Sequence, residues 1–199
     1  MHRVYFANIK TISQQELDNE YQLLNSADKA KVDRIKSEDG KKRTITGRML
    51  ARNAVAQYEG KEKNQISFSC SENGKPYVFN SSTSFSISHC RDLVVCVADN
   101  SEIGIDIEYI RPVKSGFIYR VCTHDERLFV YGSCYNLNNG LVSDKSVLRR
   151  FFTVWTLKEA YFKCIGTGIN NLKSVDVLKD IKCKSSYSIG DYIISIVLK

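Results

Sequence analysis

Two acidic residues in alternate positions, Asp106 and Glu108, are the pair in this sequence best suited to chemistry. They lie in the segment SEIGIDIE at residues 101–108, where isoleucine alternates with other residues. In a strand, successive side chains point to opposite faces, so the isoleucines fall on one face and Gly104, Asp106 and Glu108 on the other. Alternate residues lie about 6–7 Å apart at Cα, and two carboxylates that close repel unless a cation lies between them. A hard divalent ion such as Mg²⁺, shared with a substrate phosphate, would satisfy both.

A second segment, FFTVWTLKEAYFKCIGTG at residues 151–168, favours this chemistry over an ordinary amphipathic strand with a solvated acidic face. Its apolar residues recur at helical spacing, and Trp155, Glu159 and Lys163 are four apart, so they share one side of the helix. A surface ion pair beside an aromatic ring is the simpler interpretation, but a largely apolar helix seldom carries charged residues without a function. Glu159 would add a third carboxylate, as metal ligand or general base, and Lys163 would neutralise a phosphate.

These residues belong to three short motifs through which the chain resembles the larger, monomeric type of 4'-phosphopantetheinyl transferase, which activates carrier domains of nonribosomal peptide and polyketide synthetases. In order they are Gly74-Lys75-Pro76 with Phe85-Ser86-Ile87-Ser88-His89, then Gly104-Ile105-Asp106-Ile107-Glu108, then Trp155-Thr156-Leu157-Lys158-Glu159-Ala160 with Lys163. Each motif is weak alone, but their order and separations are specific, and the resemblance spans roughly residues 26 to 168. It implies an α+β fold: a pseudo-dimer of two similar α/β halves, residues 1–102 and 103–199, with the active site in the cleft between them.

The resemblance also implies an activity and its site. A serine of an apo acyl or peptidyl carrier protein would receive 4'-phosphopantetheine from coenzyme A, with Mg²⁺ (or Mn²⁺) as cofactor and 3',5'-ADP as leaving group. The expected metal ligands are Asp106, Glu108 and Glu159, and the expected catalytic residues are Glu159, Lys163 and Asp106. The expected coenzyme contacts are Lys31, Arg43, Lys75, Pro76, Ser88, His89, Lys158 and Lys163, with Lys158 steadying either the helix or the phosphates. By position in the family, residues 111–128 would either dock the carrier or pack as a connector on the core.

The region from Asp28 to Arg52 is rich in Lys and Arg, and it reads as two helices broken near residues 37–40. A solvated helix surface is the plain interpretation. A nucleic-acid-binding surface would need aromatic residues for stacking, and none lies between Tyr21 and Tyr58. Within this region Arg43 fits the family pattern for the 3'-phosphate of coenzyme A. His89 alone would more often be structural, but with Ser86 and Ser88 it gathers donors suited to phosphate. Ser86 and Cys90 depart from the family, which commonly has Asn and Ser there.

Bulk properties permit this function without requiring it. The 199 residues are 43% hydrophobic with a formal net charge of +7, which suits a substantial core and anionic partners. No apolar run approaches the roughly 18 residues of a membrane span, and the N-terminus is too polar for a signal peptide. The seven cysteines form no Cys-x-x-Cys pair, so reduced thiols in a cytoplasmic protein are expected. We expect a monomer without membrane or nucleic-acid partners; a non-catalytic coenzyme A or nucleotide-binding module and a basic nucleic-acid-binding protein remain alternatives.

Local patterns predict the elements that would position these residues. Capping boxes at Ser13 and Thr123 predict two helix starts, and a long helix is expected from about residue 144 to 165. Strands are expected near residues 4–9, 66–69, 77–79, 85–88, 93–98, 174–178 and 192–198, besides the acidic strand.

Overall fold

The computed structural model describes residues 3–70, 76–132, 140–168 and 171–199, so the motif residues Gly74 and Lys75 lie outside the described residues. The chain divides into two compact units, residues 1–103 and 104–199. Helices and antiparallel sheets are mixed within both, which confirms the α+β prediction. In the part of the chain that is described, no helix has the length and apolar character needed to cross a membrane.

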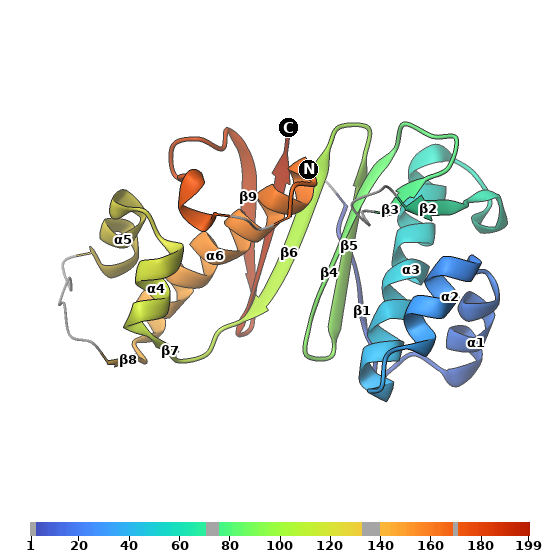
Figure 1. The fold of residues 1–199 in the computed structure, drawn as a ribbon, viewed down its shortest axis with the longest axis horizontal. Helices are drawn as coiled ribbons and strands as arrows, with labels where there is room; N and C mark the ends of the chain where they lie inside the picture. The colour runs from blue at the N-terminus through green and yellow to red at the C-terminus, as the bar shows by residue number, and fades with distance from the viewer. Residues whose placement is uncertain (1–2, 71–75, 133–139, 169–170) are drawn as a thin grey trace. The chain divides into compact units, whose positions relative to one another are not determined.

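The first unit is a small sheet covered by a long helix (Figure 1). Its elements are β1 (Tyr5–Asn8), α1 (Gln14–Gln22), α2 (Ser26–Asp33), α3 (Glu38–Glu59), η1 (Lys63–Gln65), β2 (Phe68–Cys70), β3 (Pro76–Val78), β4 (Ser84–Cys90) and β5 (Leu93–Asp99). The sheet order is β1-β5-β4 with antiparallel pairs, while β2 and β3 form a separate antiparallel pair. Helix α3 lies along β5, so its N-terminal half is carried past the turn between β4 and β5.

Helix starts and stops in this unit follow local chemistry. Ser13 and Glu16 form the predicted capping box that begins α1. The break between the basic helices spans residues 34–37, slightly earlier than predicted, because the Ser37 side chain accepts a hydrogen bond from the Gly40 amide and starts α3 there. Helix α3 then buries Ala51, Ala54 and Val55 in one apolar cluster with residues of β5.

The second unit also combines one long helix with a three-stranded sheet (Figure 1). It comprises β6 (Ile103–Tyr109), β7 (Val113–Lys114), α4 (Ser115–Val121), α5 (His124–Tyr131), β8 (Leu141–Val142), α6 (Lys145–Ile165), η3 (Leu172–Ser174), β9 (Cys183–Ile189) and β10 (Tyr192–Leu198). The sheet order is β6-β10-β9, so in both units the first strand pairs with the last and the last with the one before it. The core lies under α6, where Phe151, Phe152 and Val154 are buried.

One predicted strand is wrong, and three strands of the structure, the two-residue β7 and β8 and the longer β9, are not among the predicted ones. Residues 174–178 contain the end of η3 and turns, because Val175 and Val177 pack into the core while the Val175 carbonyl bonds a lysine instead of a neighbouring strand. The second strand of the hairpin is β9, which pairs antiparallel with β10 across Gly190 at φ 57°. Strand β9 is largely exposed and serine-rich, so it lacks the apolar alternation by which strands are found in a sequence.

Candidate active site

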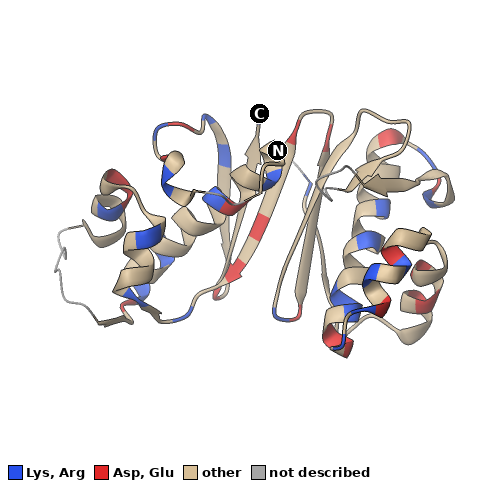
Figure 2. Ribbon diagram, in the orientation of Figure 1, with Lys and Arg blue, Asp and Glu red and all other residues tan. Residues whose placement is uncertain are grey.

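A close approach between β6 and α6 brings the acidic strand against the helix of the second motif. A Cβ atom on Gly104 would lie 1.9 Å from the Ala160 carbonyl oxygen and 2.7 Å from the Cys164 nitrogen. Only glycine allows this contact, since any side chain would collide with helix backbone. Asp106 and Glu108 follow on the same face of the strand, where Figure 2 shows acidic residues along β6.

Asp106 and Lys163 form the central ion pair of the site. The Lys163 ammonium donates to Asp106 Oδ1 at 2.7 Å and to the Ile105 carbonyl at 3.2 Å. The Asp106 side chain is only 7% exposed, whereas that of Lys163 is 33% exposed. The Lys163 ammonium therefore binds a buried carboxylate but is still partly exposed to solvent, where a phosphate could also contact it.

Glu108 is held by two donors on different oxygens. The Trp155 indole Nε1 donates to Oε1 at 3.2 Å, and Arg111 Nη1 donates to Oε2 at 3.0 Å. This contact between Arg111 and Glu108 goes beyond the expectation that residues 111–128 dock the carrier or pack on the core. An opposite charge three residues further on, at the end of a strand, was the available signal.

Glu159 completes the group of carboxylates. Burial raises the pKa of Glu159 to about 7, with a further rise from the negative charge of Asp106 and a smaller one from Glu108, against the lowering effect of Lys163. Near neutral pH this carboxyl is thus divided between its protonated and ionised forms. Such a group responds strongly to a nearby cation and can also accept a proton.

The donor set fits a hard divalent ion by its chemistry, because carboxylate oxygens are the ligands Mg²⁺ prefers and their mutual repulsion is what such an ion relieves. The present side-chain positions are not those of a formed site. Asp106 pairs with Lys163, Glu108 contacts Trp155 and Arg111, and among the described residues no three His, Cys, Asp or Glu side chains gather closely enough to hold one ion. At least one carboxylate must change its partner for the three to share a metal.

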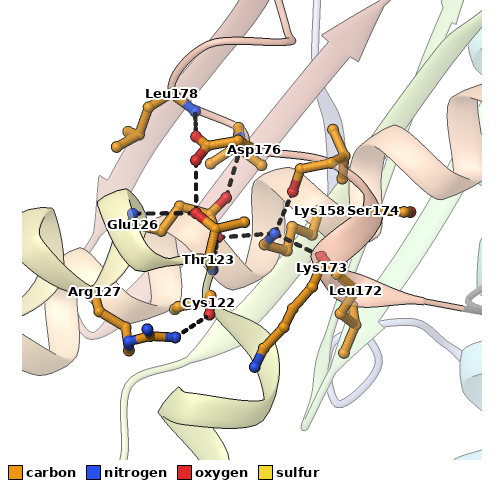
Figure 3. Close-up of polar contacts among 12 residues, drawn as sticks. Cys122, Thr123, Glu126, Arg127, Lys158, Leu172, Lys173, Ser174, Asp176 and Leu178 are labelled. Carbon is orange, nitrogen blue, oxygen red and sulfur yellow. Dashed lines mark hydrogen bonds and ion pairs between the residues drawn. The ribbon is translucent and has the colours of Figure 1, made fainter.

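Lys158 is buried among polar groups of a different set of residues (Figure 3). It is 0% exposed, and its ammonium donates to the carbonyls of Leu172 at 2.6 Å and Val175 at 2.5 Å and pairs with Glu126 Oε2 at 2.9 Å. These three partners use its three protons, so none is left for a phosphate. Of the two roles expected for Lys158, the structure supports steadying the helix, and we leave it out of the ligand set.

Glu126 is the equally buried partner of Lys158, at the start of α5. Its oxygens also accept the backbone amides of Thr123 at 2.7 Å, within the predicted capping box, and of Val177 at 2.8 Å. One ion pair thus ties α5, α6 and the segment after η3 together.

Part of the basic region in the first unit is internal. Arg48 makes a two-point ion pair with Asp28 at 2.9 and 2.7 Å, and Arg52 pairs with Glu20 at 3.0 Å, all four side chains being nearly buried. The prediction of a solvated or ligand-binding surface is therefore wrong for these two arginines. They hold α1 and α2 against α3.

Other basic residues of this region (blue on α2 and α3 in Figure 2) are exposed or half-buried. Arg43 Nη1 donates to the Arg91 carbonyl at 3.1 Å, which places it beside the turn that follows the exposed His89 and the buried Ser88. The structure thus brings Arg43 and the end of β4 together. Lys31 is exposed on α2, and Pro76 begins β3.

An open groove of about 450 Å³ lies at the start of α4 in the second unit. Arg111, Val113, Lys114, Gly116, Phe117 and Arg120 line it. Phe117 packs on Trp155 with 5.1 Å between ring centroids, and Trp155 in turn bonds Glu108. A basic, partly apolar groove therefore adjoins the acidic cluster.

The sequence matches two family models, described as 4'-phosphopantetheinyl transferase superfamily at residues 102–193 and 4'-phosphopantetheinyl transferase, N-terminal, at residues 11–101. The 4'-phosphopantetheinyl transferase HetI of Nostoc sp. is 31% identical over 159 residues, which is 77% of this chain and 64% of the relative. For the 4'-phosphopantetheinyl transferase Sfp of Bacillus subtilis the identity is 27% over 163 residues, 81% of this chain and 68% of the relative. The 4'-phosphopantetheinyl transferase gsp of Aneurinibacillus migulanus is 32% identical over 127 residues, 64% and 49% of the two chains.

The chain thus spans about half to two thirds of the length of these curated relatives. The two family matches adjoin each other between residues 101 and 102, and together they contain the acidic strand, the Glu159–Lys163 helix face and the Arg43–His89 end of the first unit. On this evidence the chain belongs to the 4'-phosphopantetheinyl transferase superfamily.

Proposed function

We propose that this protein transfers 4'-phosphopantetheine from coenzyme A to a serine of an apo acyl or peptidyl carrier protein and releases 3',5'-ADP. The observation that carries the proposal is the group of Asp106, Glu108, Glu159 and Lys163 on facing sides of β6 and α6. Three carboxylates and one ammonium group, in a member of this superfamily, suit phosphoryl-type transfer from a pyrophosphate.

The reaction consists of one displacement at phosphorus. The serine Oγ attacks the β-phosphorus of coenzyme A, and the bond from that phosphorus to the bridging oxygen breaks, so 3',5'-ADP carries the electron pair away. Glu159 accepts the serine proton. Lys163 stabilises the negative charge that develops on the departing phosphate. Mg²⁺, held by Asp106, Glu108 and Glu159, would supply further positive charge to the pyrophosphate.

We assign the 3'-phosphate of coenzyme A to the first unit. Arg43 beside the turn after β4, exposed Lys31, and Ser88 and His89 on β4 supply the donors; Lys75 and Pro76 extend this assignment by family resemblance. One coenzyme molecule must then contact both units. We propose that the two units are the similar halves of a pseudo-dimer, and the shared strand order of their sheets supports this similarity.

The deciding experiment is the intact mass of an apo carrier protein after incubation with this protein, coenzyme A and Mg²⁺. We expect one phosphopantetheine mass to be added and the addition to be lost with EDTA. Asp106→Ala should abolish transfer, and circular dichroism should show its fold retained. Full activity of that variant with Mg²⁺ present would refute the metal assignment.

Other results would point elsewhere. Coenzyme A binding without a mass change on several unrelated carriers would favour a non-catalytic binding module. Hydrogen exchange in the presence of coenzyme A offers a second readout, with slower exchange expected at the end of β4 and along α6 together. Protection confined to one unit would contradict the shared site.

A further inference from the structure

The side chain of Glu108 is oriented by Arg111, which has two further contacts of its own. Arg111 donates to Glu108 Oε2 at 3.0 Å and to the Tyr109 carbonyl at 3.1 Å, and its guanidinium lies 5.3 Å from the centre of the Phe152 ring. Two hydrogen bonds and a cation–π contact orient the guanidinium before any ligand arrives. On the other side Trp155 donates to Oε1, so Glu108 is oriented by donors on both oxygens.

A divalent ion would need the same carboxylate oxygens. The Arg111 guanidinium and a divalent ion would both be cations on one carboxylate, so their mutual repulsion weakens the binding of each. The described carboxylates do not yet gather around one point, and Glu108 is the one whose partners lie toward the end of β6.

We propose that Arg111 is a latch on Glu108: it holds this carboxylate away from the divalent ion, which binds fully only when Glu108 exchanges Arg111 for the metal. Arg111 is a positioning residue in this scheme, because it acts through Glu108. The proposal deepens the proposed function and rests on its assignment of Glu108 as a metal ligand.

The latch is easily opened and accessible. The Arg111 side chain is 50% exposed and that of Glu108 is 23% exposed, and ion pairs of that kind are weak. Arg111 also lines the groove with Lys114 and Arg120. An acidic partner in the groove would therefore compete for the guanidinium and release Glu108, which couples occupancy of the groove to assembly of the metal site.

The test is the affinity of the full chain for Mn²⁺ alone, measured by the electron paramagnetic resonance of free Mn²⁺ without coenzyme A or carrier. Arg111→Gln should bind Mn²⁺ about two- to fivefold more tightly than the unchanged protein, the range that an exposed ion pair allows. Lys114→Gln is the matched control, since it removes one positive charge from the same groove without contacting Glu108. Raised KCl screens the effect of remote charge, so the control should change little.

Combining Arg111→Gln with Glu108→Gln shows whether Arg111 acts through Glu108 or only through its positive charge. Glu108→Gln should weaken Mn²⁺ binding, and Arg111→Gln added to it should change the affinity no more than Lys114→Gln does. Equal effects of Arg111→Gln and Lys114→Gln, or a tightening that persists in the Glu108→Gln background, would overturn the latch. If no variant binds millimolar Mn²⁺ while the carrier still gains phosphopantetheine mass, the latch and the metal site fail but transfer stands; if both fail, the proposed function falls with them.

Discussion

At the scale of single residues, the site combines carboxyl groups that interact electrostatically although their environments differ. Asp106 is buried and paired with Lys163, while Glu159 is half-buried and its raised pKa favours its neutral form. A carboxyl group whose pKa is raised to about 7, as that of Glu159 is, can exchange a proton near neutral pH. The resulting pH dependence can be measured on the protein alone.

Glu159→Gln should remove a pH dependence of stability. Burial raises the folded-state pKa of Glu159 to about 7 from the ordinary 4.5, so between these values the folded state keeps a proton that the unfolded state has lost. The unfolding free energy therefore falls as pH rises through this range, and the loss is complete above about pH 7. In urea titrations at several pH values, the variant should exceed the unchanged protein above about pH 7 and match it below about pH 4.5. Glu38→Gln, at an exposed position, is the control and should leave the slope in place.

Lys158 and Lys163 lie five residues apart on one helix. Replacing Lys158 should mainly lower the unfolding free energy, and replacing Lys163 should mainly slow transfer. Lys158→Met leaves Glu126 charged and buried, which should cost about 3–5 kcal/mol of unfolding free energy. Lys163→Met leaves the buried Asp106 without this lysine, but Lys163 is one-third exposed, so the cost should be smaller than for Lys158→Met. The variant also lacks the phosphate contact and should slow transfer about a hundredfold. Urea unfolding and the intact-mass assay measure the two effects. A stable Lys158→Met protein with slow transfer would return Lys158 to the coenzyme site.

At the scale of elements, the distance between β6 and α6 decides whether the carboxylates and Lys163 meet. Gly104→Ala places a methyl group against the backbone of α6, where a rigid helix cannot yield as a side chain would. We expect a loss of about 3 kcal/mol or more of unfolding free energy and a loss of transfer even where the protein remains folded. Gly140→Ala is the matched control, because a Cβ there meets no atom within 4 Å and Gly140 is not among the residues that line the groove. Equal stability and activity of the two variants would show that α6 can move away from β6 without consequence.

Helices and strands could be predicted where their own residues carry a capping motif or a regular apolar spacing. The capping boxes at Ser13 and Thr123 begin α1 and α5 as expected, and Asp144 caps the long helix α6 at the expected start. Strand β9 carries no such signal, because its serines satisfy the sheet through pairing with β10 and through the bond between Ser186 and Ser195. Pairing of this kind depends on a neighbour brought in by folding.

At the scale of the whole molecule, the net charge of +7 suggested anionic partners, but its distribution matters more than its sum. Arg48 and Arg52 are neutralised inside the first unit, whereas Arg111, Lys114 and Arg120 line an open groove in the second. We propose that this groove docks the carrier protein, whose surface around the modified serine tends to be acidic.

Charge reversal in the groove tests this docking. Lys114→Glu together with Arg120→Glu should raise the KM for the carrier roughly tenfold through slower association and leave the KM for coenzyme A unchanged. Lys145→Glu, at an exposed position at the start of α6, should change neither. Steady-state kinetics with a carrier that passes the mass assay give both values. Unchanged carrier kinetics in the double variant would remove the groove from the interface.

The sequence alone determined the family, the acidic strand, the helix that bears Glu159 and Lys163, and the face each residue occupies, because strand and helix periods are local properties. Tertiary structure decided the rest. In the folded chain Lys158 pairs internally with Glu126, and Arg111 contacts Glu108. Arg48 and Arg52 form buried ion pairs. The physical reason is burial. The type of a charged residue does not reveal whether its side chain lies in water or against a buried partner, because folding alone decides its environment.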